Sequence, residues 1–273
     1  MVDGQALLKV KSTVSNAPLR AHSFFGNGLH LVYAWPYNPY RGRFFYWFVR
    51  IVMSQSLKKT IHLALESNDL DTVVSLAKEN RKVLSLLVRM AYDKDTLVGW
   101  RAIKAIGLTA KALVRTDYDF LRETIRKLLW SLSDESGGIG WAAPEILGEI
   151  VSAGPERFSD IIPLIAEVYD VEEKVFRPGV LYAMGKIAEV SPDLVMPFKD
   201  LIGRALSEGE PLSRVFALDL LKTLKNRLGK DDLDGLKKTI QDLLSADHSD
   251  AWVYKNDSFI CIEIGEYARS FLS

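Results

Sequence analysis

The sequence predicts an all-α fold, a right-handed α-solenoid in which helix pairs stack side by side. From Ser56 onward, apolar residues recur at steps of three and four, which is the spacing of one helix face. Short turns rich in Asp, Gly, Pro, Ser and Asn separate these helical segments, and we find no sustained strand-like alternation. One segment recurs along the chain, which indicates repeats that each cover the apolar face of a neighbour.

The last position of the recurring segment is occupied by Gly107, Gly148, Gly185 and Leu220. These positions are 41, 37 and 35 residues apart. We predict that the segment is the inner helix of each pair, at residues 99–107, 140–148, 176–185 and, more weakly, 213–220. Amphipathic outer helices are predicted at residues 118–132, 158–168, 194–206 and 233–244. A divergent last unit is predicted over residues 260–271.

These units resemble HEAT repeats, in which an outer helix, an acid-bearing turn and an inner helix opening with arginine follow one another. The resemblance covers residues 56–270. The matching turn acids are Asp95, Asp134, Asp170 and Glu208, and the matching arginines are Arg101, Arg177 and Arg214. The second unit departs from the pattern, because Ala142 replaces the arginine and Pro144 lies in the predicted first helical turn, where proline is tolerated.

The resemblance implies particular contacts. A turn acid can accept hydrogen bonds from the first N–H groups of the inner helix, and it can pair with an arginine of its own or the next repeat. Such pairs would form a ladder along the stack. Small residues such as Ala105 and Gly148 would let neighbouring helices approach closely. Residues 134–145 also resemble a motif of uncharacterised bacterial HEAT-repeat proteins, which implies a bacterial origin.

Residues 1–52 differ from the predicted repeat domain, residues 53–273. They contain six basic residues, one acid and eleven of the 28 aromatic residues. Three interpretations remain open: a membrane-surface anchor through residues 41–52, a strap that binds a partner or caps the solenoid, or sequence upstream of a translation start at Met53. We favour the third, because composition and periodicity change at Met53. No segment is long enough to be a transmembrane helix.

Charge and cysteine content limit the functional classes. The chain has 35 basic and 35 acidic residues, and residues 53–273 have 29 and 34, so nucleic-acid binding is not expected. The single cysteine, Cys261, excludes an intrachain disulfide and suits a cytoplasmic protein. We expect Cys261 to be a buried core residue. The four histidines are scattered, and we predict no metal, no cofactor and no catalytic residue.

Residues 130–145 are the least ordinary stretch, with three glycines and two acids between two tryptophans. We favour a purely structural interpretation, a longer turn between repeats. The alternative is a partner-binding rim at the starts of successive inner helices, because Trp and Arg are favoured binding anchors. Its candidate residues are Trp100, Arg101, Asp134, Glu135, Trp141, Glu145 and Arg177.

We therefore predict a non-enzymatic protein–protein interaction scaffold that binds a protein partner on its concave inner-helix face. A DNA-binding or DNA glycosylase-type protein is the alternative, because some glycosylases resemble HEAT repeats, and a chromophore role like that of phycobilin lyases is a weaker one. The basic residues of the last repeats, including Lys222, Lys237 and Lys238, are expected on solvated faces. The sequence does not indicate an oligomeric state.

Overall fold

The structure is a computed structural model that describes residues 56–132, 141–171 and 174–272. These residues belong to one compact unit, Phe48–Ser273. Residues 1–52, Asp134 and Glu135 lie outside the described residues, so the predictions made for them remain predictions. The described part is mostly helical, which confirms the all-α solenoid.

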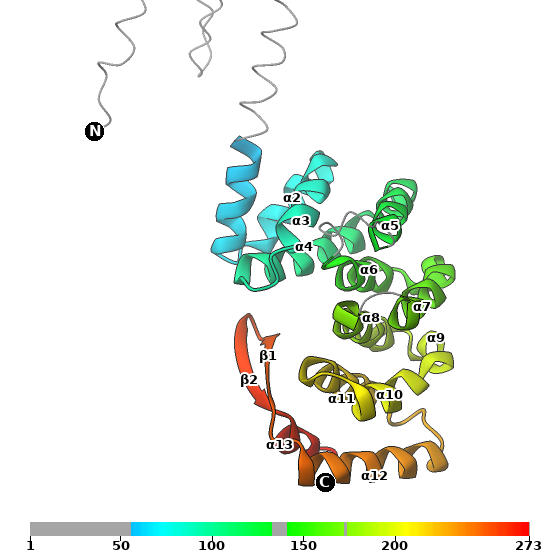
Figure 1. Cartoon of the computed structure of the whole chain (residues 1–273). Coiled ribbons are helices and arrows are strands. Elements are labelled where there is room, and N and C mark those ends of the chain that lie inside the picture. Colours follow the sequence, from blue (N-terminus) through cyan, green and yellow to red (C-terminus); the bar gives the residue numbers. More distant parts are fainter. Residues whose placement is uncertain (1–55, 133–140, 172–173, 273) are drawn as a thin grey trace, which may run out of the picture. The chain divides into compact units, whose positions relative to one another are not determined.

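Helix pairs form the body of this unit, and Figure 1 shows an inner row in which each helix follows the last. The inner helices are α4 (Leu97–Leu113), α6 (Ala143–Ser152), α8 (Arg177–Val190) and α11 (Pro211–Leu224). The outer helices are α3 (Lys82–Ala91), α5 (Tyr118–Leu132), α7 (Ile162–Val171), α10 (Asp200–Glu208) and α12 (Lys230–Ala246). The predicted inner segments fall on the inner helices, with α6 beginning only at Ala143 and α8 at Arg177. The predicted outer segments 118–132 and 233–244 fall on α5 and α12, whereas 158–168 and 194–206 begin in shorter elements that precede α7 and α10. The core consists of the apolar faces between the helices.

Shorter elements complete the described chain. A first helix covers residues 56–66 and precedes α2 (Leu70–Glu79). Between the pairs lie η1 (Pro155–Ile161), η2 (Lys174–Phe176), α9 (Pro192–Val195) and η3 (Met196–Phe198). Helix α13 (Ile264–Arg269) follows the strands described below. Pro144 and Pro178 lie in the first turns of α6 and α8, as predicted, where a missing N–H leaves no helical hydrogen bond unmade.

Gly148 allows a close backbone approach within the inner row. A Cβ at this position would lie 2.4 Å from the Cα of Ala183, so α6 and α8 meet backbone to backbone. This confirms the close approach predicted from the sequence. Gly185 differs, since a Cβ there would meet no heavy atom within 4 Å.

The predicted ladder of charges exists, but largely with other partners. Pairs at about the repeat spacing join Arg81 to Asp117, Arg122 to Asp160, Arg204 to Asp170, and Arg227 to Asp193. Nε of Arg177 and Nε of Arg214 donate to the carbonyl oxygens of Tyr169 and Leu206, at 3.2 Å each. Nη1 of Arg214 also pairs with Asp247 at 2.5 Å, again at about the repeat spacing. The N-cap of α4 is Thr96 rather than the predicted Asp95, because the Thr96 hydroxyl accepts from the N–H of Gly99.

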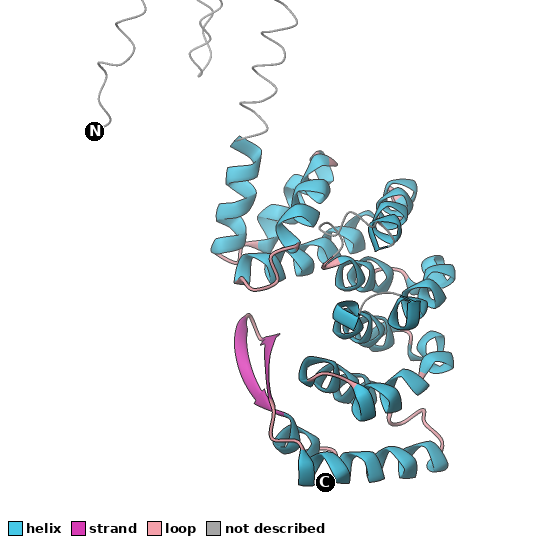
Figure 2. Cartoon of the chain, viewed as in Figure 1, coloured by secondary structure: helices cyan, strands magenta, loops and turns pink. Residues whose placement is uncertain are grey.

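The divergent last unit predicted over residues 260–271 is not a helical repeat, and the expectation of no strands is wrong here. Strands β1 (Asp250–Lys255) and β2 (Ser258–Glu263) form an antiparallel hairpin, coloured magenta in Figure 2. Its two turn residues, Asn256 and Asp257, have φ values of 51° and 63°. A two-residue hairpin turn of type I′ needs positive φ at both positions, and Asn and Asp tolerate it. The prediction for Cys261 is also wrong, because β2 leaves this residue exposed.

Candidate functional site

The hairpin lies against the inner helices rather than projecting into solvent. Alternate β1 residues are buried, among them Ala251 and Val253. The ring of Tyr254 stacks on Trp100 of α4, with centroids 5.4 Å apart and planes 8° apart. Trp100 also meets the ring of Tyr182 on α8 edge to face, at 5.4 Å. The hairpin therefore covers Trp100, which is buried.

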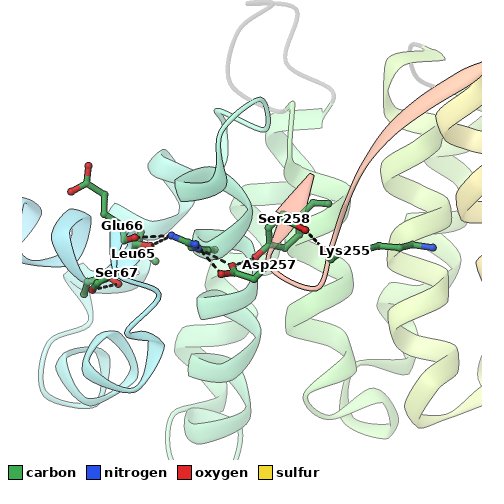
Figure 3. Close-up of polar contacts among 9 residues, drawn as sticks. Leu65, Glu66, Ser67, Lys255, Asp257 and Ser258 are labelled. Carbon is green, nitrogen blue, oxygen red and sulfur yellow. Dashed lines mark hydrogen bonds and ion pairs between the residues drawn. The ribbon is translucent and has the colours of Figure 1, made fainter. Parts of the chain in front are cut away.

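The hairpin turn is fixed to the first repeats by Arg101 and Asp257, which we call the latch. Nε and Nη2 of Arg101 donate to the two carboxylate oxygens of Asp257, at 2.8 Å each. Nη1 of Arg101 donates to the carbonyl oxygens of Leu65 and Glu66, at the end of the first helix (Figure 3). One buried guanidinium thus joins three segments, and its hydrogen bonds lower the pKa of Asp257.

Lys255 contacts the other side of the inner face, and in Figure 3 its side chain points away from Asp257. Its ammonium group donates to Asp219 of α11 at 2.9 Å and to the hydroxyl of Tyr267 at 3.0 Å. Asp219 also accepts from the Tyr267 hydroxyl. The hairpin is therefore held at α11 as well as at α4.

A cavity of about 420 Å³ lies between the hairpin and helices α4, α8 and α11. We call it the lysine cleft, because each of these four elements contributes one lysine. Its lining comprises Lys104, Leu181, Tyr182, Gly185, Lys186, Glu189, Phe216, Asp219, Lys222, Thr223, Tyr254, Lys255 and Asn256. The cleft combines ammonium groups with an aromatic and aliphatic wall, which is a surface suited to binding.

Among the described residues, carboxylate partners exist for two of the four lysines in the cleft. Lys186 pairs with Glu189 at 2.8 Å and Lys255 pairs with Asp219. Lys104 and Lys222 form no ion pair with any described residue. The Lys104 ammonium lies 4.8 Å from the centroid of the Tyr254 ring, a cation–π contact.

A buried carboxyl group lies beside the cleft. Glu149 of α6 accepts a hydrogen bond from the hydroxyl of Tyr182, at 2.6 Å. Gly107 leaves room for it, since a Cβ there would lie 2.1 Å from Oε2 of Glu149. Burial raises the pKa of Glu149 and that of Tyr182. This pair positions the Tyr182 ring that forms part of the cleft wall.

The structure does not bring the predicted rim residues together in one exposed surface. Trp100 and Arg101 are covered by the hairpin. Glu145 is buried and pairs with Lys94 at 2.8 Å. Arg177 is half-buried over the ring of Tyr169, and Trp141 is 44% exposed. A partner-binding role for these residues stays a prediction. Most of them already form contacts within the chain.

Sequence reasoning missed the residues that form the cleft. The sequence predicts Lys222 on a solvated face and places Lys104 within the recurring segment. It assigns neither lysine to a site. The signal for the hairpin was present as two short apolar runs around Asn256 and Asp257, which is a turn sequence. Nothing in the sequence indicated which inner-helix residues would face that hairpin.

In the part of the chain that the structure describes, neither a cluster of metal-ligating side chains nor a membrane-spanning helix is found. No three His, Cys, Asp or Glu side chains there converge as a possible metal site. No described helix is both long enough and apolar enough to span a bilayer.

Comparisons with known proteins identify similar chains. No family model matches the sequence. An uncharacterised protein of Archaeoglobus fulgidus is 29% identical over 141 residues, which cover 51% of this chain and 73% of the relative. That relative is archaeal, so the bacterial origin implied by residues 134–145 receives no support from it and stays a prediction.

Solved structures with a similar fold include engineered and natural proteins. An engineered protein has 14% sequence identity and a TM-score of 0.46, covering 79% of this chain and 96% of that chain. An archaeal HEAT-like repeats protein from Thermococcus onnurineus NA1 has 17% identity and a TM-score of 0.31, covering 79% and 98%. The solenoid is established by the stacking of the chain's own helices, described above.

Proposed function

We propose that this chain is a non-enzymatic protein–protein interaction scaffold, which binds a protein partner on its concave inner-helix face. The observation that carries the proposal is the lysine cleft. It lies on the inner row, and four separate elements contribute charged and aromatic groups to it. Helical repeats typically use this face for binding. We also propose a cytoplasmic location, for which the single cysteine is the only support.

A pair of glycine substitutions tests where the partner binds. Gly185 lines the cleft, and a Cβ there meets nothing within 4 Å, so Gly185→Phe fills the cleft without a clash at Cβ. Gly235 of the outer helix α12 is equally unobstructed and is exposed, so Gly235→Phe is a matched control. Both variants should keep wild-type helicity, measured by circular dichroism.

The readout is quantitative affinity capture of proteins from an extract of the source organism. We expect a reproducible partner with the wild-type chain and with Gly235→Phe, and its loss with Gly185→Phe. Equal capture by both glycine variants would show that the partner does not use the cleft. The absence of any reproducible partner would refute the scaffold proposal itself.

A further inference from the structure

The charge of the lysine cleft is opposite to that of the surrounding repeat domain. The lining carries four lysines against two carboxylates, Glu189 and Asp219. Residues 53–273 as a whole have 29 basic and 34 acidic residues. The positive charge of the cleft attracts anionic groups, and the mildly negative remainder of the domain repels them.

Lys104 and Lys222, which form no ion pair within the described part of the chain, are available to an added anion. Lys104 is half-buried on α4 and Lys222 is exposed on α11, so an anion between them would contact two inner helices. Glu149 and Asp257 interact electrostatically with Lys104. Both are already hydrogen bonded elsewhere, to Tyr182 and Arg101 respectively. Lys104 therefore keeps hydrogen-bonding capacity for a ligand, because an ammonium group has three donors.

The remainder of the lining favours a peptide over a nucleic acid. Leu181 and Phe216 offer apolar surface against which the methylene groups of an acidic side chain can pack. Glu189 and Asp219 would repel a continuous row of phosphates. A peptide avoids this repulsion, because it can place a carboxylate at Lys104 and an uncharged residue beside each acid.

The hairpin shows how such a peptide can be recognised. Its turn presents the carboxylate of Asp257 to a basic side chain of α4, and its flanking strand lies on the inner helices in extended conformation. We infer that the lysine cleft binds an extended acidic segment of the partner protein, with carboxylates at Lys104 and Lys222. This inference rests on the proposed scaffold function and names the chemistry of its partner.

A labelled peptide of alternating Glu and Gly residues tests this chemistry by fluorescence anisotropy at low salt. The cleft variant is Lys104→Gln with Lys222→Gln. The matched control is Lys111→Gln with Lys238→Gln, two exposed lysines on α4 and α12 that have no ion pair with a described residue. We expect the peptide to bind about tenfold more weakly to the cleft variant, and the control to stay within about twofold of wild type.

Further probes separate the possible outcomes. A Gln–Gly peptide should not bind, and added salt should weaken the Glu–Gly complex. Equal affinity of the two double variants, no binding of the Glu–Gly peptide, or preferred binding of a single-stranded oligonucleotide would each overturn the inference. If Gly185→Phe abolishes partner capture while the lysine cleft variant retains it, the scaffold function stands and the acidic ligand is wrong.

Discussion

The latch between Arg101 and Asp257 can be broken by a substitution that leaves the hairpin turn intact. Asp257 has a φ of 63°, a conformation that Asn adopts nearly as readily as Asp. Asp257→Asn therefore removes the negative charge and one acceptor while keeping the turn geometry. Any loss of stability is then attributable to the contacts of this carboxylate, with Arg101 and with the hydroxyl of Tyr254 at 2.7 Å, rather than to backbone strain.

The size of the effect follows from the exposure of the two partners. The Arg101 side chain is 11% exposed and that of Asp257 is 32% exposed, so the pair lies between surface and buried cases. Exposed pairs contribute up to about 1 kcal/mol, and loss of one partner from a buried pair costs about 3–5 kcal/mol. We expect a cost of about 2 kcal/mol, which increases the population of the open hairpin about 30-fold.

Hydrogen exchange of the hairpin amides measures this opening directly. Asp257→Asn should accelerate exchange at amides of β1 and β2, while amides of α8 keep their wild-type rates. Asp193→Asn is the control, because it breaks the pair with Arg227, whose two side chains are 51% and 74% exposed. We expect this control to change stability by less than about 0.5 kcal/mol.

Acid should reproduce the effect of the substitution in the wild-type chain. The Arg101 guanidinium lowers the pKa of Asp257 below its ordinary value of 3.8. A group whose pKa is lower in the folded state stabilises the fold at pH values above its unfolded-state pKa. That stability is lost as the pH falls through its folded-state pKa. The difference between wild type and Asp257→Asn should therefore decrease once the pH falls below the ordinary value, and it should vanish below the lowered folded-state pKa. Unchanged hairpin exchange in Asp257→Asn at neutral pH would refute the latch.

Three other predictions concern stability and are measured by denaturant unfolding. Gly148→Ala should destabilise the fold by more than about 2 kcal/mol, because its Cβ meets the α8 backbone. Gly185→Ala should stabilise the fold by about 0.5–1 kcal/mol, because its Cβ meets no atom. If Gly148→Ala were the more stable of the two variants, the helix contacts would be contradicted. Lys94→Met should cost about 2–4 kcal/mol, because it leaves the buried Glu145 carboxylate without its ion pair, and a cost near zero would contradict that pairing. Glu149→Gln should stabilise the folded state at about pH 7.5 and not at about pH 4. Burial raises the pKa of Glu149, so ionisation of its carboxyl group lowers the stability of the wild-type chain as the pH rises. Equal effects of the substitution at both pH values would contradict this.

The helices were predictable because local signals define them. Helix α5 has the predicted bounds, Tyr118–Leu132, since its apolar spacing and flanking turns are all within one segment. The hairpin had a weaker signal, two six-residue strands around Asn256 and Asp257, and its apolar run was taken for a helix. Short apolar runs do not distinguish the two structures by periodicity alone.

The lysine cleft could not be predicted, because it depends on where the hairpin returns. Arg101 and Asp257 are 156 residues apart, and no local pattern relates them. Lys104 and Lys255 line one cavity only because the latch brings β1 back to α4. The same contact explains why Trp100, a candidate residue of the partner-binding rim, is buried under Tyr254.

A variant that weakens the latch also distinguishes two modes in which a partner could bind the concave face. A partner that needs Trp100 and Arg101 must first open the hairpin, so the free energy of the latch reduces its affinity. Asp257→Asn should then strengthen its binding, by up to the factor of about 30 by which opening becomes easier. A partner that binds in the closed lysine cleft instead contacts Tyr254 and Lys255, which only the closed hairpin places there. Its affinity should not rise in Asp257→Asn, because opening can only reduce the closed fraction, so a gain or no gain in affinity, measured by titration calorimetry, identifies the binding mode.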